Sequence, residues 1–300
     1  MKTIILILSL LQVIIFAEEK GNSTMKDNCV ITINSGKVSI SADPQNGGLI
    51  TSFKLGDYEF ITQKKDSKEG FGSTVWPSPQ SVWNWPPPAV LDRKPYTVEN
   101  LEDTVKMTSG EGCKTGFQLS KEIVSGKENS IKLKYEMKNI SNEVKKTAVW
   151  EISRAPKGGM LFYPIGAPEM GVKFFPPVDV KNIDGIIWFD ANLNKQENHK
   201  LSYGDGKEGW LAYAINNKLF IKKFDDILPA ETAPGEGEIL YYSSFTCDYI
   251  EIEVQGKYAE LAPGKSVSLE VEWIGIEIPE GIKVEAGNKE LVEFVRSVIK

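Results

Sequence analysis

The 300-residue chain is poor in histidine and cysteine, with one and three residues respectively, and this scarcity excludes several types of site. His199 lies in a polar stretch and is expected at the surface, so a histidine-rich metal site or a Ser-His-Asp triad has no imidazole to use. Cys29, Cys113 and Cys247 are far apart in the sequence, which excludes a CxxC metal or redox motif. Two of them can pair in an oxidising compartment, but the sequence does not say which, and a chain without a disulfide is equally compatible.

Phosphate-binding and calcium-binding loops are missing as well. The sequence has no glycine-rich loop of the P-loop or dinucleotide-binding type. The segment 190–194 resembles the start of a calcium loop, but Lys195 replaces the invariant glycine and Leu201 the final glutamate. We therefore expect no cofactor and no metal ion. The formal net charge is −6, and an acidic surface argues against nucleic acid and anionic membranes as partners.

Long apolar runs are confined to the N-terminus. One lysine precedes an apolar stretch at 4–16, and two glutamates follow Ala17. A membrane-spanning helix needs roughly 20 apolar residues, so this shorter stretch predicts a signal peptide at 1–17, with an uncleaved anchor as the alternative. We expect a periplasmic or secreted protein, without membrane insertion after signal removal and folded as one domain over 18–300. Its oligomeric state stays open.

Most of the remaining chain alternates with the period of two that half-buried strands show. In 130–138 apolar residues alternate with lysines and a glutamate, and 266–274 behaves similarly. Turn signals such as Asn46-Gly47-Gly48 separate the strand candidates. Near the C-terminus, Asn288 can cap a single helix whose apolar residues recur at helical spacing. Many strands with short turns and no βαβ alternation predict an all-β protein of antiparallel sheets packed as a sandwich.

The segment 70–96 breaks this rhythm, since it holds three tryptophans and six prolines. Proline cannot donate to a sheet ladder, so we expect a long ordered loop here. Its tryptophans are Trp76, Trp83 and Trp85. They offer flat apolar faces, and Gln80 and Asn84 add amide donors and acceptors. This combination suits a pyranose ring, which has apolar C–H faces and a belt of hydroxyls. The alternative is that the indoles plug one end of the sandwich.

Two strand candidates carry carboxylates that chemistry can use. Alternation in 249–255 places Glu251 and Glu253 on one face, where they repel each other unless they are solvated or paired. An ordinary solvent face is the alternative. In the other strand Glu151 is flanked by apolar residues, and an altered pKa there would suit an acid or base. Arg154 can pair with a carboxylate of another strand, and a structural ion pair is the alternative for this strand.

Three parts of the sequence resemble a known superfamily, the galactose-mutarotase-like proteins. The segment 46–53, Asn-Gly-Gly-Leu-Ile-Thr-Ser-Phe, is similar to their first strand. The glutamate strand and Leu-x-Pro-Gly turn in 249–264, followed by a strand ending in Trp273, resemble their last strands. The tryptophan-proline segments 72–80 and 83–88 are similar to the signature of an uncharacterised bacterial branch, the DUF4380-type domain. The resemblance spans nearly all of 18–300.

This resemblance implies an antiparallel β-supersandwich of the galactose mutarotase-like type, with a concave sheet face and a carbohydrate-shaped site. Aldose mutarotases use a glutamate near the C-terminus as base and a histidine as acid. Glu253, or less readily Glu251, falls where that glutamate is expected. The histidine does not carry over, because His199 lies in a polar stretch. This departure argues against ordinary mutarotase activity, and Glu151 or a tyrosine would have to act as the acid.

The resulting hypothesis is an exported carbohydrate-binding protein that recognises a sugar or oligosaccharide on a concave sheet face. The expected binding residues are Trp76, Gln80, Trp83, Asn84, Trp85, Arg154 and Glu251. The first alternative is a carbohydrate-active enzyme of the epimerase, lyase or glycosidase type, with Glu253 and Glu151 as acid and base. The second is a non-catalytic structural or protein-interaction module, because tryptophan and arginine also dominate protein interfaces.

Overall fold

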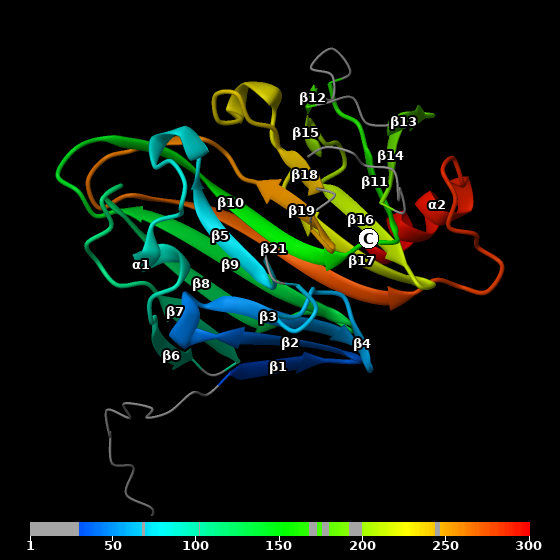
Figure 1. Ribbon diagram of the computed structural model, residues 1–300, viewed down its shortest axis with the longest axis horizontal. Helices are drawn as coiled ribbons and strands as arrows, with labels where there is room; N and C mark the ends of the chain where they lie inside the picture. Colours follow the sequence, from blue (N-terminus) through cyan, green and yellow to red (C-terminus); the bar gives the residue numbers. More distant parts are fainter. Residues whose placement is uncertain are drawn as a thin grey trace, which may run out of the picture.

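The computed structural model describes residues 30–67, 70–101, 103–167, 173–175, 180–191, 200–243 and 247–300. The predicted signal peptide at 1–17, Cys29 and His199 lie outside these residues. Within them, almost all regular structure is antiparallel β-sheet (Figure 1). This confirms the all-β sandwich predicted from alternation.

One sheet, sheet A, has eleven strands among the described residues. Its main path runs, in spatial order, through β1 (Ile31–Ser35), β2 (Val38–Asp43), β3 (Leu49–Leu55), β5 (Ser73–Ser78), β10 (Lys145–Pro156), β19 (Tyr249–Gln255), β18 (Ile239–Ser243), β15 (Lys200–Gly204) and β12 (Lys173–Phe175). Two short strands pair beside this path, β4 (Tyr58–Glu59) with β3 and β20 (Ala259–Leu261) with β10.

The second sheet, sheet B, has ten strands in the described part of the chain. Their spatial order is β13 (Val180–Ile183), β14 (Ile186–Asp190), β11 (Met160–Pro164), β16 (Trp210–Ile215), β17 (Lys218–Phe224), β21 (Ser266–Glu277), β9 (Ser130–Asn139), β8 (Phe117–Ser125), β7 (Thr104–Thr108) and β6 (Thr97–Leu101). The segments 130–138 and 266–274, predicted as strands, are β9 and β21, and they pair with each other.

The main core lies between the two sheets. Phe53 of β3 packs against Phe220 and Trp273 of sheet B, with ring centroids 5.2 and 5.3 Å apart. One continuous cluster of buried apolar side chains joins strands of both sheets. The inward faces of the strands are therefore occupied by packing, and only an outward face or the loops can present a ligand site.

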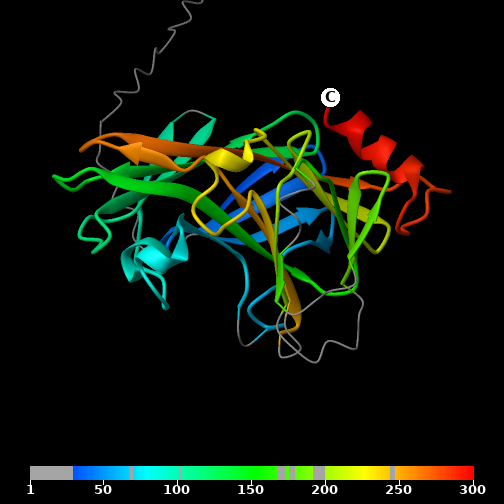
Figure 2. The same ribbon diagram turned by 90° about the horizontal axis from the view of Figure 1, so that it is seen from above.

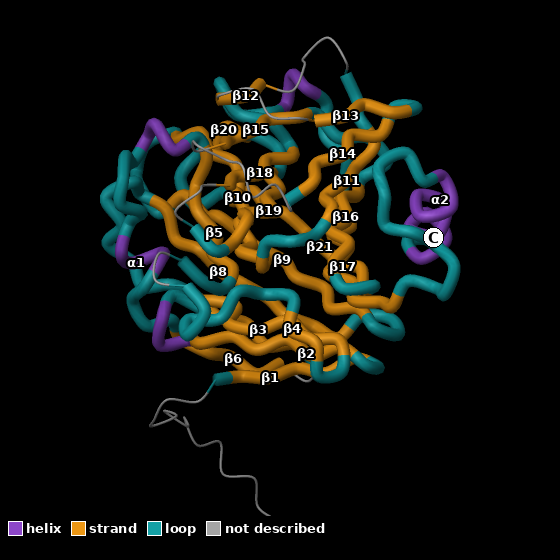
Figure 3. The backbone as a smooth tube through the Cα atoms, turned by 45° about the vertical axis from the view of Figure 1, so that its right-hand side comes forward, coloured by secondary structure: helices purple, strands orange, loops and turns teal. Residues whose placement is uncertain are grey.

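The predicted C-terminal helix is α2 (Lys289–Val298), and Asn288 caps it by accepting from the backbone N–H of Glu290 and Leu291. It packs beyond β16 and β17 at one end of the molecule (Figures 1 and 2). A single turn, α1 (Ala89–Asp92), lies on the opposite side (Figure 3) and is not predicted from the sequence. Three 3₁₀ turns are η1 (Pro44–Asn46), η2 (Gln80–Val82) and η4 (Pro229–Glu231). Neither α-helix of the described chain has the length and apolar character needed to cross a bilayer.

The prediction that 70–96 contains no strand is wrong for its first part. Ser73–Ser78 forms β5, which pairs with β10 along its whole length. On its other side only Ser73 pairs with β3, opposite Ile50. At Pro77, therefore, β5 has a strand partner on one side only, and such an edge position tolerates proline.

Candidate functional site

Three neighbouring strands of sheet A bring four predicted site residues, Trp76, Arg154, Glu251 and Glu253, to one outward face. The register places Trp150 of β10 opposite Trp76 of β5, and Arg154 of β10 opposite Glu251 of β19. Because side chains alternate between the faces of a strand, Glu253 shares the face of Glu251. Figure 1 shows β5, β10 and β19 side by side. Segments almost 180 positions apart in the sequence thus contribute to one surface through non-local pairing.

Four indoles form a cluster on this face. Trp76 lies at its centre, with the rings of Trp83, Trp85 and Trp150 edge-on to it at centroid distances of 5.7, 5.8 and 5.4 Å. The Trp76 indole N–H donates to Asp92 Oδ1 of α1 at 2.8 Å. The cluster is therefore fixed by both ring packing and hydrogen bonding. Trp85 is 68% exposed, so its ring can stack against a ligand.

A cavity of about 460 Å³, here called the indole cavity, opens beside this cluster. Its lining residues are Trp76, Gln80, Trp85, Trp150, Arg154, Glu236, Leu240, Tyr242, Cys247, Tyr249, Glu251 and Glu253. A second hollow of about 490 Å³, the adjoining cavity, shares Trp76, Trp85 and Arg154 with it. Both volumes fall within the roughly 300–1,000 Å³ typical of ligand pockets.

Arg154 is the cation at the floor of the indole cavity. Its Nε lies 2.9 Å from Glu251 Oε1, and its Nη1 donates to Thr74 Oγ1 at 3.4 Å. Its guanidinium carbon is 5.8 Å from the ring centroid of Trp76. Burial raises the pKa of Glu251, and the positive charge of Arg154 partly offsets that rise. Arg154 and Glu251 together offer donors and acceptors at one spot.

Glu253 is the most perturbed carboxyl group in the cavity. Its side chain is buried, and its Oε2 accepts from the Trp150 indole N–H at 2.6 Å. Burial raises the pKa of Glu253 well above the ordinary range, and the nearby charge of Glu251 raises it further. Glu253 therefore keeps its proton to a higher pH than an exposed glutamate does, and it can donate a hydrogen bond or a proton to a ligand.

The sequence pattern did not identify Glu236, a third carboxyl group of the cavity. Gln255 links it to the sheet, because its Nε2 donates to Glu236 Oε2 at 3.3 Å and its Oε1 accepts from Ser78 Oγ at 2.6 Å. Burial raises the pKa of Glu236. Glu236 lies between glycines outside any strand, where no alternation assigns a face. Tyr242, in contrast, pairs with Glu251 across β18 and β19, so alternation along β18 would have found it once that pairing was known.

Glu151 does not lie in the cavity, which corrects its pairing with Glu253 as acid and base. It points from β10 into the interior between the sheets, where its Oε2 lies 2.6 Å from Lys222 Nζ of β17 and both side chains are fully buried. Its Oε1 accepts from Ser73 and Ser153 at 3.0 and 2.7 Å. The alternative of a structural ion pair is therefore what the structure contains, because Glu151 and Glu253 occupy opposite faces of sheet A.

Two other predicted ligand residues line neither cavity. Trp83 is half-buried behind Trp76, and its indole N–H donates to the carbonyl of Pro77 at 2.7 Å. Asn84 is exposed and has a φ of 56°, in the left-handed region that asparagine tolerates well. Both residues shape the turn that presents Trp85. Of the nine predicted site residues, the structure brings Trp76, Gln80, Trp85, Arg154, Glu251 and Glu253 together in the indole cavity.

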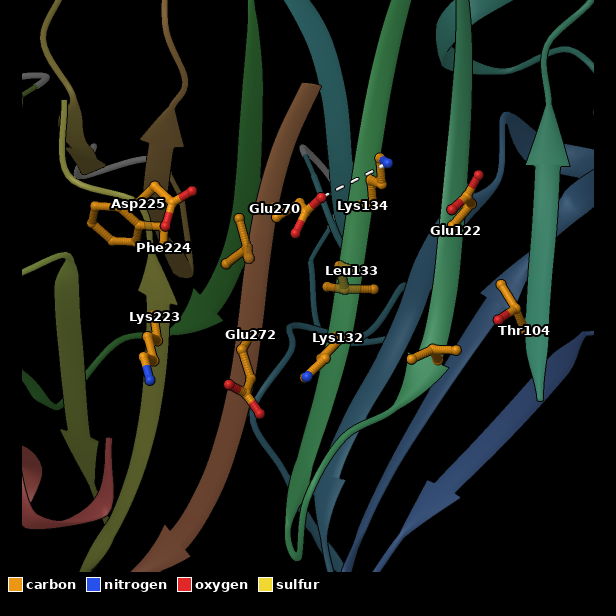
Figure 4. Close-up of a pocket in the computed structure, with 12 residues that line it drawn as sticks. Thr104, Glu122, Lys132, Leu133, Lys134, Lys223, Phe224, Asp225, Glu270 and Glu272 are labelled. Carbon is orange, nitrogen blue, oxygen red and sulfur yellow. Dashed lines mark ion pairs between the residues drawn. The ribbon is translucent and has the colours of Figure 1, made fainter. Parts of the chain in front are cut away.

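A third hollow, of about 400 Å³, lies on the outer face of sheet B. Figure 4 shows lysines beside glutamates on neighbouring strands, and the ion pair of Lys134 with Glu270 measures 3.8 Å. Phe224 is the one aromatic residue that lines it. Interspersed charges of both signs are typical of a solvated sheet face, so this hollow lacks the aromatic walls that a sugar site needs.

Comparison with known proteins defines the family and the fold. The model of a family described as "Domain of unknown function (DUF4380)" matches residues 30–276. No functionally curated protein matches the chain. Among solved structures, a galactose mutarotase-like protein from Lactobacillus casei has a TM-score of 0.58 at 11% identity, with 82% of this chain and 100% of that chain covered.

Two further structures agree with this fold. The Slr1438 protein from Synechocystis has a TM-score of 0.58 at 13% identity and covers 86% of this chain and 99% of its own. A galactose mutarotase-like protein from Clostridium acetobutylicum has a TM-score of 0.55 at 12% identity, with 83% and 95% covered. At these identities the similarity establishes the galactose mutarotase-like fold alone.

Proposed function

This chain belongs to the DUF4380 family, and from that premise we propose that it binds a sugar or oligosaccharide in the indole cavity. The observation that carries the proposal is the convergence of indoles, carboxyl groups and an arginine on one cavity. Galactose mutarotase-like folds among the structural neighbours support a sugar-related role.

The chemistry of the lining matches the two kinds of surface that a pyranose presents. The apolar C–H face of the ring stacks on Trp85, whose exposed indole is held by Trp76. Ring hydroxyls donate to Glu251 and accept from Arg154, the two groups already paired at 2.9 Å. A few polar groups among aromatic walls is the usual composition of a small-molecule site.

The place of action is part of the same proposal. The apolar stretch at 4–16 and the glutamates after Ala17 support export of the protein to the periplasm or the medium. N-terminal sequencing of the protein from its native host tests the signal peptide, since a mature chain beginning near residue 18 is expected and an intact Met1 would contradict its cleavage.

Binding is tested by a glycan array followed by titration calorimetry with the retained glycans. We expect Trp85→Ala to weaken binding about tenfold or more, because burying a large apolar side chain against a ligand contributes roughly 1.5–3 kcal/mol. Leu101→Ala is the matched control, since Leu101 is another exposed large apolar residue, at 51%, but lies on β6 and does not line the cavity. If the wild-type protein retains no glycan, or Trp85→Ala binds equally well, the proposal fails.

A second candidate function is catalysis on the bound sugar, and the burial and raised pKa of Glu253 favour it. A buried carboxyl group that keeps its proton can transfer it to a sugar oxygen as a general acid. The partner base would come from the cavity, with Glu251 and Glu236 as candidates. Proton NMR of each bound sugar follows epimerisation, elimination or hydrolysis. Glu253→Gln is expected to abolish turnover while binding persists, and a wild type that converts none of its ligands excludes this candidate.

A further inference from the structure

The adjoining cavity differs from the indole cavity in charge. Among the described residues that line it are three cations, Lys64, Arg93 and Arg154, and one carboxylate, Asp92. The described lining of the indole cavity has the opposite balance, with three glutamates and one cation, Arg154. On a protein with a formal net charge of −6, such a concave positive spot attracts anions that the rest of the surface repels.

Two of these cations keep their charge available for a ligand. Lys64 is exposed, and among the described residues its Nζ has no carboxylate within ion-pair distance; the ring of Phe71 lies 6.0 Å away. Arg93 Nη1 lies 3.9 Å from Asp92 Oδ2, a long ion pair, and its side chain is 53% exposed. The other Asp92 oxygen accepts from the Trp76 indole at 2.8 Å. Lys64 and Arg93 therefore retain most of their donors.

Arg154 joins the two cavities. Its Nε faces Glu251 in the indole cavity, and its Nη1 faces Thr74, which lines the adjoining cavity. Trp76 and Trp85 also line both hollows. A ligand whose ring stacks on the shared indoles can thus extend a substituent toward Lys64 and Arg93 without leaving protein contact.

We propose that the adjoining cavity binds an oxyanion carried by the saccharide in the indole cavity, so that the ligand class is an acidic saccharide. The inference rests on the proposed function and names its substrate class. A carboxylate, phosphate or sulfate offers the oxygens that arginine and lysine recognise. The described lining of the indole cavity offers the same group one arginine, already paired with Glu251, so the difference in charge between the cavities orients the ligand.

The test compares matched sugars that differ only in charge. The probes are galacturonate with galactose, glucuronate with glucose, and the 6-phosphates of both hexoses, each titrated into the purified protein by calorimetry. We expect the charged member to bind about tenfold or more tighter, as one charge-assisted hydrogen bond provides. This preference should shrink as salt rises, since the cations are exposed. The uronate and phosphate arms distinguish the two sources of the oxyanion.

A pair of variants locates the effect. The double variant Lys64→Gln/Arg93→Gln is expected to lose the preference for charged sugars while neutral sugars bind as before. Lys65→Gln/Lys94→Gln removes the same charge from adjacent exposed residues that line neither cavity, and it should keep the preference.

The outcomes separate this inference from the function on which it rests. Equal affinity within every sugar pair overturns the inference and leaves saccharide binding in place. A charge preference that survives Lys64→Gln/Arg93→Gln overturns the location. If no sugar of either kind binds, both the inference and the proposed function fail.

Discussion

Replacing Glu151 by glutamine should destabilise the protein strongly. Glu151 lies on β10 like the cavity residue Arg154, but its side chain points into the interior. Glu151 and Lys222 are fully buried and 2.6 Å apart. Removing one partner of a buried ion pair costs about 3–5 kcal/mol, because the other charge stays buried without compensation. Lys222 keeps its hydrogen bonds to Ser153 and to the carbonyl of Ile252, at 2.9 and 2.8 Å. We therefore expect the lower end of that range, about 3 kcal/mol.

Urea unfolding followed by tryptophan fluorescence measures this loss, and a midpoint lower by about 1 M or more is expected. Burial lowers the pKa of Lys222, and the charge of Glu151 opposes that shift. Without Glu151, the folded variant releases the Lys222 proton at a pH where the unfolded chain still keeps it. The difference in free energy of unfolding between wild type and Glu151→Gln should therefore become smaller as the pH rises. Adding Lys222→Met should recover much of the stability.

Glu253→Gln is the matched control for Glu151→Gln, because it changes a glutamate that burial already favours in its protonated form. At pH 4.5, where the glutamate is largely protonated in the folded state, this substitution should change the free energy of unfolding by less than about 1 kcal/mol. If Glu151→Gln unfolds at the wild-type urea concentration but loses ligand binding, the assignment of Glu151 to the interior is refuted.

The remaining predictions concern the indole cluster and two carboxyl groups. Trp76→Ala should cost about 3–5 kcal/mol, as buried tryptophans do, whereas Trp85→Ala should change stability by less than about 1 kcal/mol; equal losses in a thermal-unfolding comparison would contradict the cluster geometry. Burial raises the pKa of Glu238 from 4.5 to about 8, so the free energy of unfolding of the wild type should fall as the pH rises from 4.5 to 8. Urea titrations across this range should show a smaller fall for Glu238→Gln. Burial likewise raises the pKa of Glu253, so Glu253→Gln should gain stability relative to wild type as the pH rises above about 4.5, and a constant difference would indicate an ionised Glu253.

Strands with one buried and one solvent-exposed face were predictable from the sequence. The segments 130–138 and 266–274 alternate because they form the central strands β9 and β21, whose outer face carries lysines and glutamates. Helix α2 was equally predictable, since Asn288 and the apolar spacing describe a capped amphipathic helix. These are local signals, which a single chain segment carries by itself.

The cavity itself was only partly predictable, because pairing between distant strands builds it. The sequence places Glu151 among apolar neighbours, but β10 is buried on both faces, so residue polarity could not show which face points to the interior and which to the cavity. The register of β10 against β19 determines which side chains of β10 lie beside Glu251 and Glu253, and a sequence pattern does not contain this register. Glu236 was not predicted as a site residue for another reason: it lies between two glycines outside any strand, where side chains follow no periodic pattern. Pro77 misled the assignment of β5 because one-sided pairing tolerates proline.

The central claim is most directly tested by a crystal structure of the protein with a saccharide that it binds in solution. A pyranose ring stacked on Trp85, with hydroxyls about 2.6–3.2 Å from Glu251 or Arg154, is the result we predict. Ligand density on the charged face of sheet B around Lys134 and Glu270, with the indole cavity empty at saturating ligand, would contradict the account.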